Sequence, residues 1–273
     1  MSRPAQHPLR RLALAAACWG ALSCLDISSP VTGIGSISQV ISPAPSVVVG
    51  DTARDSTNPA VPLRVVAFAP NGDTVRDANV EFFVLDTSGG LVLTPGGLAY
   101  GAKLSPAAKV VARVTPAHGS GALQTDTLPL PVVPVPTRLT ASTTSDTIHI
   151  DPSATDTLRG NDSPGLAVLL HGPDTSVVRR YLVRYAIDSV PPGREGQPLV
   201  RLVDEGGHPS MVDTTDLSGT ASRILHLRLA AVPPELLAAG AIDSVIVHAS
   251  VIYRGGQVEG SPMRFVVYIR SPF

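Results

Sequence analysis

The stretch Ser222-Arg-Ile-Leu-His-Leu-Arg-Leu229 decides the fold class of this chain. Its residues alternate, so that the three leucines share one face of an extended chain while Ile224 and His226 share the other. This period of two predicts a β-strand whose leucine face packs into the core.

Similar apolar runs, separated by turn residues, fill most of the chain. The sequence contains 24 glycines and 26 prolines, spread along its length rather than gathered in one tract. Many short strands with frequent turns are typical of a β-sandwich or barrel. A first series of runs covers residues 36–41, 46–49, 62–69, 79–85, 91–94, 109–115 and 123–133. A second series covers residues 147–150, 165–171, 177–187, 198–203, 222–229, 243–253 and 257–269.

Each series has the number and spacing of strands of an immunoglobulin-like sandwich, about seven strands in roughly 100 residues. The sequence therefore predicts an all-β chain with two tandem immunoglobulin-like β-sandwich domains, over residues 36–136 and 144–271. Between them, the proline-rich segment 129–136 has two interpretations. It is either an extended, polyproline-like linker or the last edge strand of the first sandwich.

Turn residues predict how some strands connect. Asn71-Gly72 suits the positive φ angles of a type I′ turn and predicts a hairpin there. Residues 254–256, Arg-Gly-Gly, predict a second hairpin between the last two strands. Residues 233–239 are the one segment that favours a helix of about two turns, because prolines begin it and Gly240 follows it.

The segment Thr215-Asp216-Leu-Ser-Gly219-Thr-Ala221 resembles a turn of bacterial immunoglobulin-like domains of the invasin/intimin group, which reads T-D-x-x-G-x-A. In such a turn Asp216 caps the backbone and Gly219 takes a positive φ. The first half of the chain resembles another hairpin of that group, D-x-x-G-x-x-V, at residues 69–75 around Asn71 and Gly72. Each half carries part of the pattern. The resemblance implies a surface stalk, spacer or adhesin module.

The first residues predict export. Arg3, Arg10 and Arg11 precede an apolar stretch over residues 12–22, as in a secretory signal. The stretch is shorter than the ~20 residues that span a bilayer as a helix. Residues 21–24, Ala-Leu-Ser-Cys24, also resemble the lipobox of bacterial lipoproteins. That resemblance implies a signal peptide over residues 1–23 and a lipid on Cys24.

An ordinary signal peptide, cut near Ala21 or Ser23, is the alternative to the lipoprotein. Cys18 and Cys24 are the two cysteines of the chain, so removal of residues 1–23 leaves no pair for a disulfide. The Ser-, Pro- and Gly-containing residues 24–35 predict a flexible tether. Leu25, at the sorting position of the lipoprotein family, favours the outer membrane over the inner one.

Charge argues against nucleic acid as a partner. The chain has 21 basic and 22 acidic residues, a net charge of −1, and loss of three signal arginines makes it 18 − 22 = −4. No basic stripe is present, whereas nucleic-acid binding requires one. The only tryptophan, Trp19, lies in the signal, which argues against an aromatic platform for carbohydrate.

No catalytic set can be assembled from the sequence. Residues 166–172, ending in His171-Gly172, resemble the strand and oxyanion turn of α/β-hydrolases, which also need a G-x-S-x-G elbow. The sequence contains no such elbow, and Ser210 in Gly-His-Pro-Ser-Met fails its spacing. We therefore expect no enzyme, no catalytic residues and no cofactor.

Metal sites are not expected either. The histidines are scattered without the short spacings of a zinc site. A D-x-D-x-D-G loop is absent, but calcium between loops stays open because aspartates are dense in one region. These are Asp146, Asp151, Asp156, Asp162 and Asp174.

The sequence thus predicts an exported, lipid-anchored protein of the cell envelope, with a structural or adhesive role and no chemistry of its own. Its expected partners are the membrane, through the lipid on Cys24, and an unidentified protein or glycan. The alternative is a periplasmic or surface module that binds a protein or carbohydrate.

Overall fold

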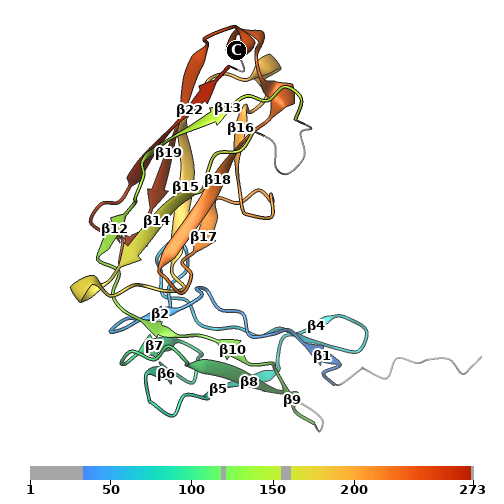
Figure 1. Ribbon diagram of the computed structural model, residues 1–273. Helices are drawn as coiled ribbons and strands as arrows, with labels where there is room; N and C mark the ends of the chain where they lie inside the picture. The colour runs from blue at the N-terminus through green and yellow to red at the C-terminus, as the bar shows by residue number, and fades with distance from the viewer. Residues whose placement is uncertain (1–32, 118–120, 155–160, 272–273) are drawn as a thin grey trace, which may run out of the picture.

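The structure, a computed structural model, describes residues 33–117, 121–154 and 161–271 (Figure 1). In these residues it is built from β-strands and a few single 3₁₀ turns, with no α-helix. Two clusters of buried apolar residues form, one mainly before and one mainly after residue 136. We call residues 33–136 the N-terminal part and residues 137–271 the C-terminal sandwich. The predicted all-β fold is confirmed.

Two facing sheets form the C-terminal sandwich. The first has the order β12 (Arg138–Thr140), β14 (Leu166–His171), β18 (Thr220–Leu227) and β16 (Val200–Val203). The second has the order β13 (Ser145–His149), β22 (Met263–Arg270), β19 (Ile242–Ser250), β15 (Leu182–Ser189) and β17 (Val212–Thr214). The strand order β12–β14–β18–β16 matches the ABED sheet of the immunoglobulin fold, and the order β22–β19–β15 matches its GFC sheet. The C-terminal sandwich is therefore immunoglobulin-like.

The core of this sandwich follows the alternation that the sequence predicts. On β18, Leu225 and Leu227 are fully buried, as expected for the leucine face. Tyr185 on β15 is 1% exposed, and its hydroxyl donates a 2.9 Å hydrogen bond to the carbonyl of Ala221 on β18. A buried hydroxyl needs such a partner, and this bond joins the two sheets through the core.

The N-terminal part has shorter strands and more separate sheets. β10 (Leu128–Pro129), β8 (Lys109–Thr115) and β5 (Asn79–Val84) form one sheet, and β9 (Leu123–Gln124) also pairs with β8. β1 (Ser36–Ile37), β3 (Ala67–Phe68) and β4 (Thr74–Val75) form another, and β6 (Leu91–Leu93) pairs with β7 (Ala99–Gly101). β2 (Val47–Val48) pairs in parallel with β11 (Val132–Val133). Alternate residues of β8, among them Val110 and Val114, lie in the core.

The hairpin at Asn71-Gly72 is present, but its turn type differs from the prediction. The amide of Gly72 donates to the carbonyl of Ala69 at 2.8 Å, and Gly72 has φ 90° while Asn71 is not in the left-handed region. The turn is therefore a type I turn at Pro70 and Asn71 followed by a left-handed glycine. Pro70 explains the difference, because its fixed φ suits the first central position of a type I turn.

The predicted hairpin at residues 254–256 is confirmed, between β20 (Ile252–Tyr253) and β21 (Gly256–Gln257). Its two central residues, Arg254 with φ 48° and Gly255 with φ 80°, make this turn type I′.

The predicted two-turn helix is wrong. Residues 233–239 contain one short 3₁₀ turn, η5 (Pro234–Leu237), and the other 3₁₀ turns are η2 (Pro173–Thr175), η3 (Arg194–Gly196) and η4 (Leu229–Ala231). Two adjacent prolines start the segment, and each removes a backbone donor. Too few residues follow before Gly240 for a nucleated α-helix to form.

The proline-rich segment 129–136 ends the N-terminal part as strands rather than as a free linker. Leu130, Val132 and Val133 are buried. The next strand, β12, already pairs with β14 in the C-terminal sandwich. A domain that started at residue 144 would lose this strand and its buried Leu139.

Two independently folding domains stay a prediction, and two fragments test it. Residues 137–271 should unfold in one cooperative thermal transition with a β-type far-UV spectrum, because they contain both complete sheets. Residues 144–271 should melt at a lower temperature, since they lack β12. A fragment 137–271 that is unfolded on its own would reject the division into two domains.

Candidate functional site

The two parts meet at a buried carboxylate. Asp51 follows β2 in the turn after Gly50 and is 5% exposed. Arg54 contacts it from the same loop, with Nε 3.0 Å from Oδ2 and an Nη group 3.0 Å from Oδ1. Arg254 of the C-terminal sandwich contacts it from the other side, with Nε 3.0 Å from Oδ2. The amide of Thr52 donates to Oδ1 at 2.8 Å.

The environment of Asp51 favours its ionised form. Burial alone would raise the pKa of Asp51, but the hydrogen bonds from Arg54, from the amide of Thr52 and from Arg254 outweigh burial and hold the pKa below its ordinary value. In turn, Asp51 raises the pKa of Arg54 and of Arg254. The carboxylate therefore stays charged at neutral pH and holds an arginine from each part.

The type I′ turn of the β20–β21 hairpin positions Arg254. From this turn Arg254 also donates to the carbonyl of Gly50 at 2.7 Å, and its guanidinium carbon lies 5.3 Å from the centre of the Tyr253 ring. The distance to the ring is within the range of a cation–π contact. The hairpin thus fastens the C-terminal sandwich to the loop after β2.

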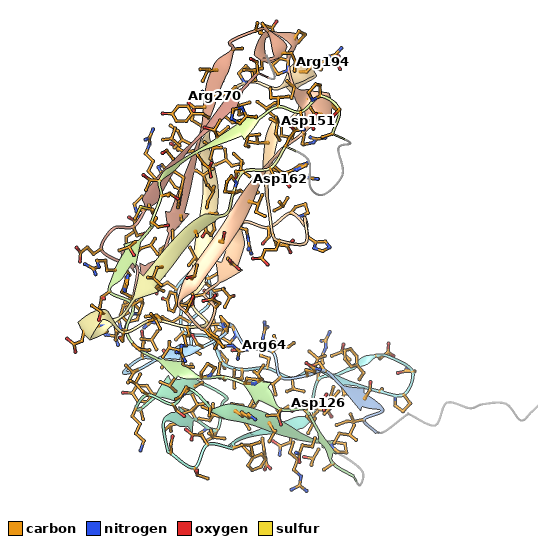
Figure 2. All side chains as sticks on the ribbon, viewed as in Figure 1. Arg64, Asp126, Asp151, Asp162, Arg194 and Arg270 are labelled. Carbon is orange, nitrogen blue, oxygen red and sulfur yellow. The ribbon has the colours of Figure 1, made fainter. Side chains whose placement is uncertain are left out.

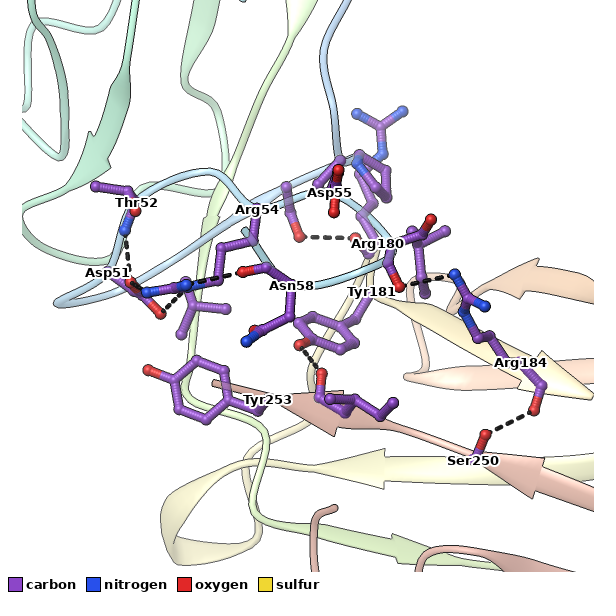
Figure 3. Close-up of a pocket in the computed structure, with 17 residues that line it drawn as sticks. Asp51, Thr52, Arg54, Asp55, Asn58, Arg180, Tyr181, Arg184, Ser250 and Tyr253 are labelled. Carbon is purple, nitrogen blue, oxygen red and sulfur yellow. Dashed lines mark hydrogen bonds and ion pairs between the residues drawn. The ribbon is translucent and has the colours of Figure 1, made fainter. Parts of the chain in front are cut away.

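A second set of contacts joins residues 44–58, a segment that includes β2, to residues 180–184 at the start of β15. Ser46 donates to the carbonyl of Arg180 at 2.7 Å, and Arg184 donates to the carbonyl of Ser56 at 2.7 Å (Figure 3). Arg180 has φ 53°, a conformation that costs a non-glycine residue free energy and is kept only where its surroundings fix it. Val48 and Val133 pack with the core of the C-terminal sandwich, so the junction also has an apolar component.

A cavity of about 70 Å³ lies between these contacts. Its wall includes Tyr181 and Tyr253, and the hydroxyl of Tyr181 donates to the carbonyl of Ile252 at 2.8 Å. Burial raises the pKa of both tyrosines, so they are neutral donors at physiological pH. Polar and charged residues of the segments 44–58 and 180–184 line much of the rest, together with apolar residues, which are Ala44, Pro45, Val48, Leu182 and Ile252.

The structure places the other predicted residues away from this junction or outside what it describes. Cys24 and the predicted signal peptide lie outside the described residues. Asn71 and Gly72 lie in the β3–β4 hairpin of the N-terminal part. Asp216 accepts hydrogen bonds from the amides of Ser218 and Thr220, and Gly219 has φ 82°.

The two residues that most suggested a hydrolase each have a separate structural contact. His171 ends β14, and its Nε2 lies 3.0 Å from the hydroxyl of Thr140. The hydroxyl of Ser210 donates to the carbonyl of Val212 at 2.9 Å and accepts from Arg223 at 3.2 Å. No hydrogen bond between described residues joins His171 to Ser210.

Most of the loop aspartates stabilise turns or pair locally. Asp151 accepts from Ser153, and Asp162 Oδ1 lies 2.6 Å from Nδ1 of His226. His226 is only 1% exposed although it lies on the face of β18 opposite the leucines, because Asp162 pairs with it along the backbone. Asp156 lies outside the described residues. Within the described ranges, no three His, Cys, Asp or Glu side chains converge as metal ligands would.

Sequence reasoning missed the residues that form the junction. Asp51, Arg54 and Arg184 lie in ordinary turn and strand patterns. The sequence placed Arg254 in a hairpin, but it did not indicate the partner of Arg254, because Asp51 lies 203 positions before it. The local sequence signal was Arg-Gly-Gly at residues 254–256, which predicted the turn that carries Arg254 but not the partner of its side chain.

Comparisons with known proteins identify no family. No family model and no curated protein matches the chain. Among solved structures, the chain is similar to the S-layer protein rSbsC(31-844), with 11% identity, a TM-score of 0.27 and coverage of 86% of this chain and 28% of that one. It is also similar to the D0-D1 domain of intimin, with 14% identity, a TM-score of 0.26 and coverage of 87% and 97%. Human protocadherin-24 EC1-2 gives 13% identity, a TM-score of 0.24 and coverage of 86% and 98%.

TM-scores this low do not establish a relationship to any of these proteins. The C-terminal sandwich is assigned to the immunoglobulin-like fold from the order of its strands. A search of the described residues for a membrane-spanning helix found none of sufficient length and apolarity.

Proposed function

We propose that this chain is an exported, lipid-anchored protein of the bacterial cell envelope whose all-β body has a structural or adhesive role. The observation that carries the proposal is the junction at Asp51, where one buried carboxylate holds arginines from both parts. A body with a fixed junction suits a spacer that presents its far loops at a distance from its anchor. In this proposal the predicted signal peptide directs export of the chain, and the lipid on Cys24 anchors it to the membrane.

We also propose that the protein is not an enzyme. His171 and Ser210, the residues closest to a catalytic pattern, make separate hydrogen bonds to other groups. A nucleophile needs a base within hydrogen-bond reach, and this pair does not provide one.

A binding module for a protein or glycan is the second candidate function. The cavity between the N-terminal part and the C-terminal sandwich favours it, because ligand sites occur preferentially at such interfaces. The two functions are compatible, since an envelope spacer can carry a ligand site.

The anchor can be tested by metabolic labelling with a fatty-acid probe in a bacterial host. We expect the wild-type chain to be labelled and Cys24→Ala to be unlabelled, because only the lipobox cysteine receives the lipid. Cys18→Ala is the matched control and should be labelled like the wild type. Equal labelling of wild type and Cys24→Ala would reject the lipid anchor and leave an ordinary secreted protein.

A further inference from the structure

The cavity at the junction has room for a small ligand. Its volume is about 70 Å³, several times the roughly 15 Å³ that one water molecule needs. It therefore has space for a group of about five non-hydrogen atoms. Residues of both parts line it, so a ligand there would touch both.

Positive charge exceeds negative charge around this cavity. Arg54, Arg180 and Arg184 line it together with Asp51 and Asp55, which gives 3 − 2 = +1. Arg254 also binds Asp51 and brings the sum to +2. The complete chain has a net charge of −1, so this local excess is opposite in sign to the protein as a whole.

Two of these arginines have no acidic partner among the described residues. Arg54 and Arg254 both bind Asp51. Among the described residues, the guanidinium of Arg184 donates to the carbonyl of Ser56, and the guanidinium of Arg180 donates to the carbonyl of Pro129 at 3.5 Å. A guanidinium has five N–H donors, so most donors of Arg184 stay available.

We propose that this cavity binds a phosphate group, with Arg184 as its main ligand and Arg180 as a second source of positive charge. Arginine is suited to phosphate because two parallel N–H groups can donate to two of its oxygens. A phosphate has five non-hydrogen atoms and a negative charge, which fits both the volume and the charge excess. The group can come from free phosphate or from a phosphate ester of a larger molecule.

Binding should be measured by isothermal titration of the full chain with sodium phosphate, at constant ionic strength in chloride. We expect saturable binding by the wild type. Arg184→Gln should weaken it by at least about tenfold, the effect of losing a hydrogen bond to a charged group. Arg264→Gln, which removes the same charge from an exposed position on β22, is the matched control and should bind like the wild type.

A variant with the opposite effect makes the test sharper. Asp55 is the acidic residue of the wall that has no arginine partner among the described residues. Asp55→Asn should therefore strengthen binding by about two- to threefold, as expected for a screened like charge. Glycerol phosphate, titrated in parallel, distinguishes the sources. Tighter binding of the ester indicates a larger natural ligand, and equal or weaker binding indicates free phosphate.

Two results would overturn the proposal. One is the absence of saturable binding of both phosphate and glycerol phosphate. The other is binding that Arg184→Gln and Arg180→Gln leave at wild-type strength. Neither result bears on the lipid anchor, which the labelling experiment tests separately.

Discussion

Gly219→Val should destabilise the C-terminal sandwich by about 2–6 kcal/mol. Gly219 has φ 82°, where a β-branched residue is strained by about 1–3 kcal/mol. A Cβ at this position would also lie 3.0 Å from Cβ of Val177 and 3.2 Å from the carbonyl oxygen of Leu170. Crowding of this kind adds about 1–3 kcal/mol. Urea unfolding of the full chain, followed by circular dichroism, measures the change.

Gly240→Val is the matched control for this experiment. Gly240 has nearly the same φ, 76°, but a Cβ there would meet no atom of the described residues within 4 Å. The free energy of unfolding that Gly240→Val loses should therefore reflect the backbone strain without the crowding. This loss should be smaller than that of Gly219→Val by at least about 1 kcal/mol. Equal losses of unfolding free energy in the two variants would mean that the close contacts of Gly219 with Val177 and Leu170 do not contribute to the destabilisation.

Asp51→Ala should lower the free energy of unfolding by about 2–4 kcal/mol and loosen the junction. Breaking a buried ion pair typically costs 3–5 kcal/mol because a charge is left buried and unpaired. The cost is smaller here because Arg54 and Arg254 are partly exposed, 31% and 53%, and water can solvate them. Small-angle scattering should show a broader range of shapes than in the wild type.

Asp126→Ala is the control for Asp51→Ala, because it removes an exposed carboxylate of the N-terminal part. It should change neither the unfolding curve nor the scattering. An Asp51→Ala protein that scatters like the wild type would show that the apolar contacts alone hold the junction.

The effect of Asp51→Ala should depend on pH in a defined direction. The pKa of Asp51 is lower in the folded protein than its ordinary value of 3.8. A group with a depressed pKa adds stability above its unfolded pKa and loses that contribution as the pH falls through its folded pKa. The difference between wild type and variant should therefore be constant from pH 7 down to about pH 5 and shrink below about pH 4.

The strands and the larger turns could be predicted because their causes are local. The alternation over residues 222–229 depends on neighbouring residues only, and β18 buries Leu225 and Leu227 as predicted, whereas Leu229 lies beyond the strand in η4 and is half-buried. The hairpin at residues 254–256 was predicted for the same reason. The turn type at Asn71 was not, because Pro70, rather than the Asn-Gly pair, decides it.

The junction could not be predicted because its cause is not local. Asp51 and Arg254 are 203 positions apart, and neither has a neighbour that distinguishes it from an ordinary turn residue. The helix prediction failed for the opposite reason: local signals at residues 233–239 favoured a helix, but two prolines and a short length left only a 3₁₀ turn.

The parallel pairing of β2 with β11 has a mechanical consequence. The amides of Val47 and Val49 donate to the carbonyls of Pro131 and Val133, both at 2.9 Å, and β11 leads within a few residues into β12. A pulling force on the C-terminal sandwich is thus transmitted along β11, nearly at right angles to these bonds. Both bonds are sheared together instead of opening one after the other, so the N-terminal part holds β11 against tension better than a hairpin that is peeled from its end.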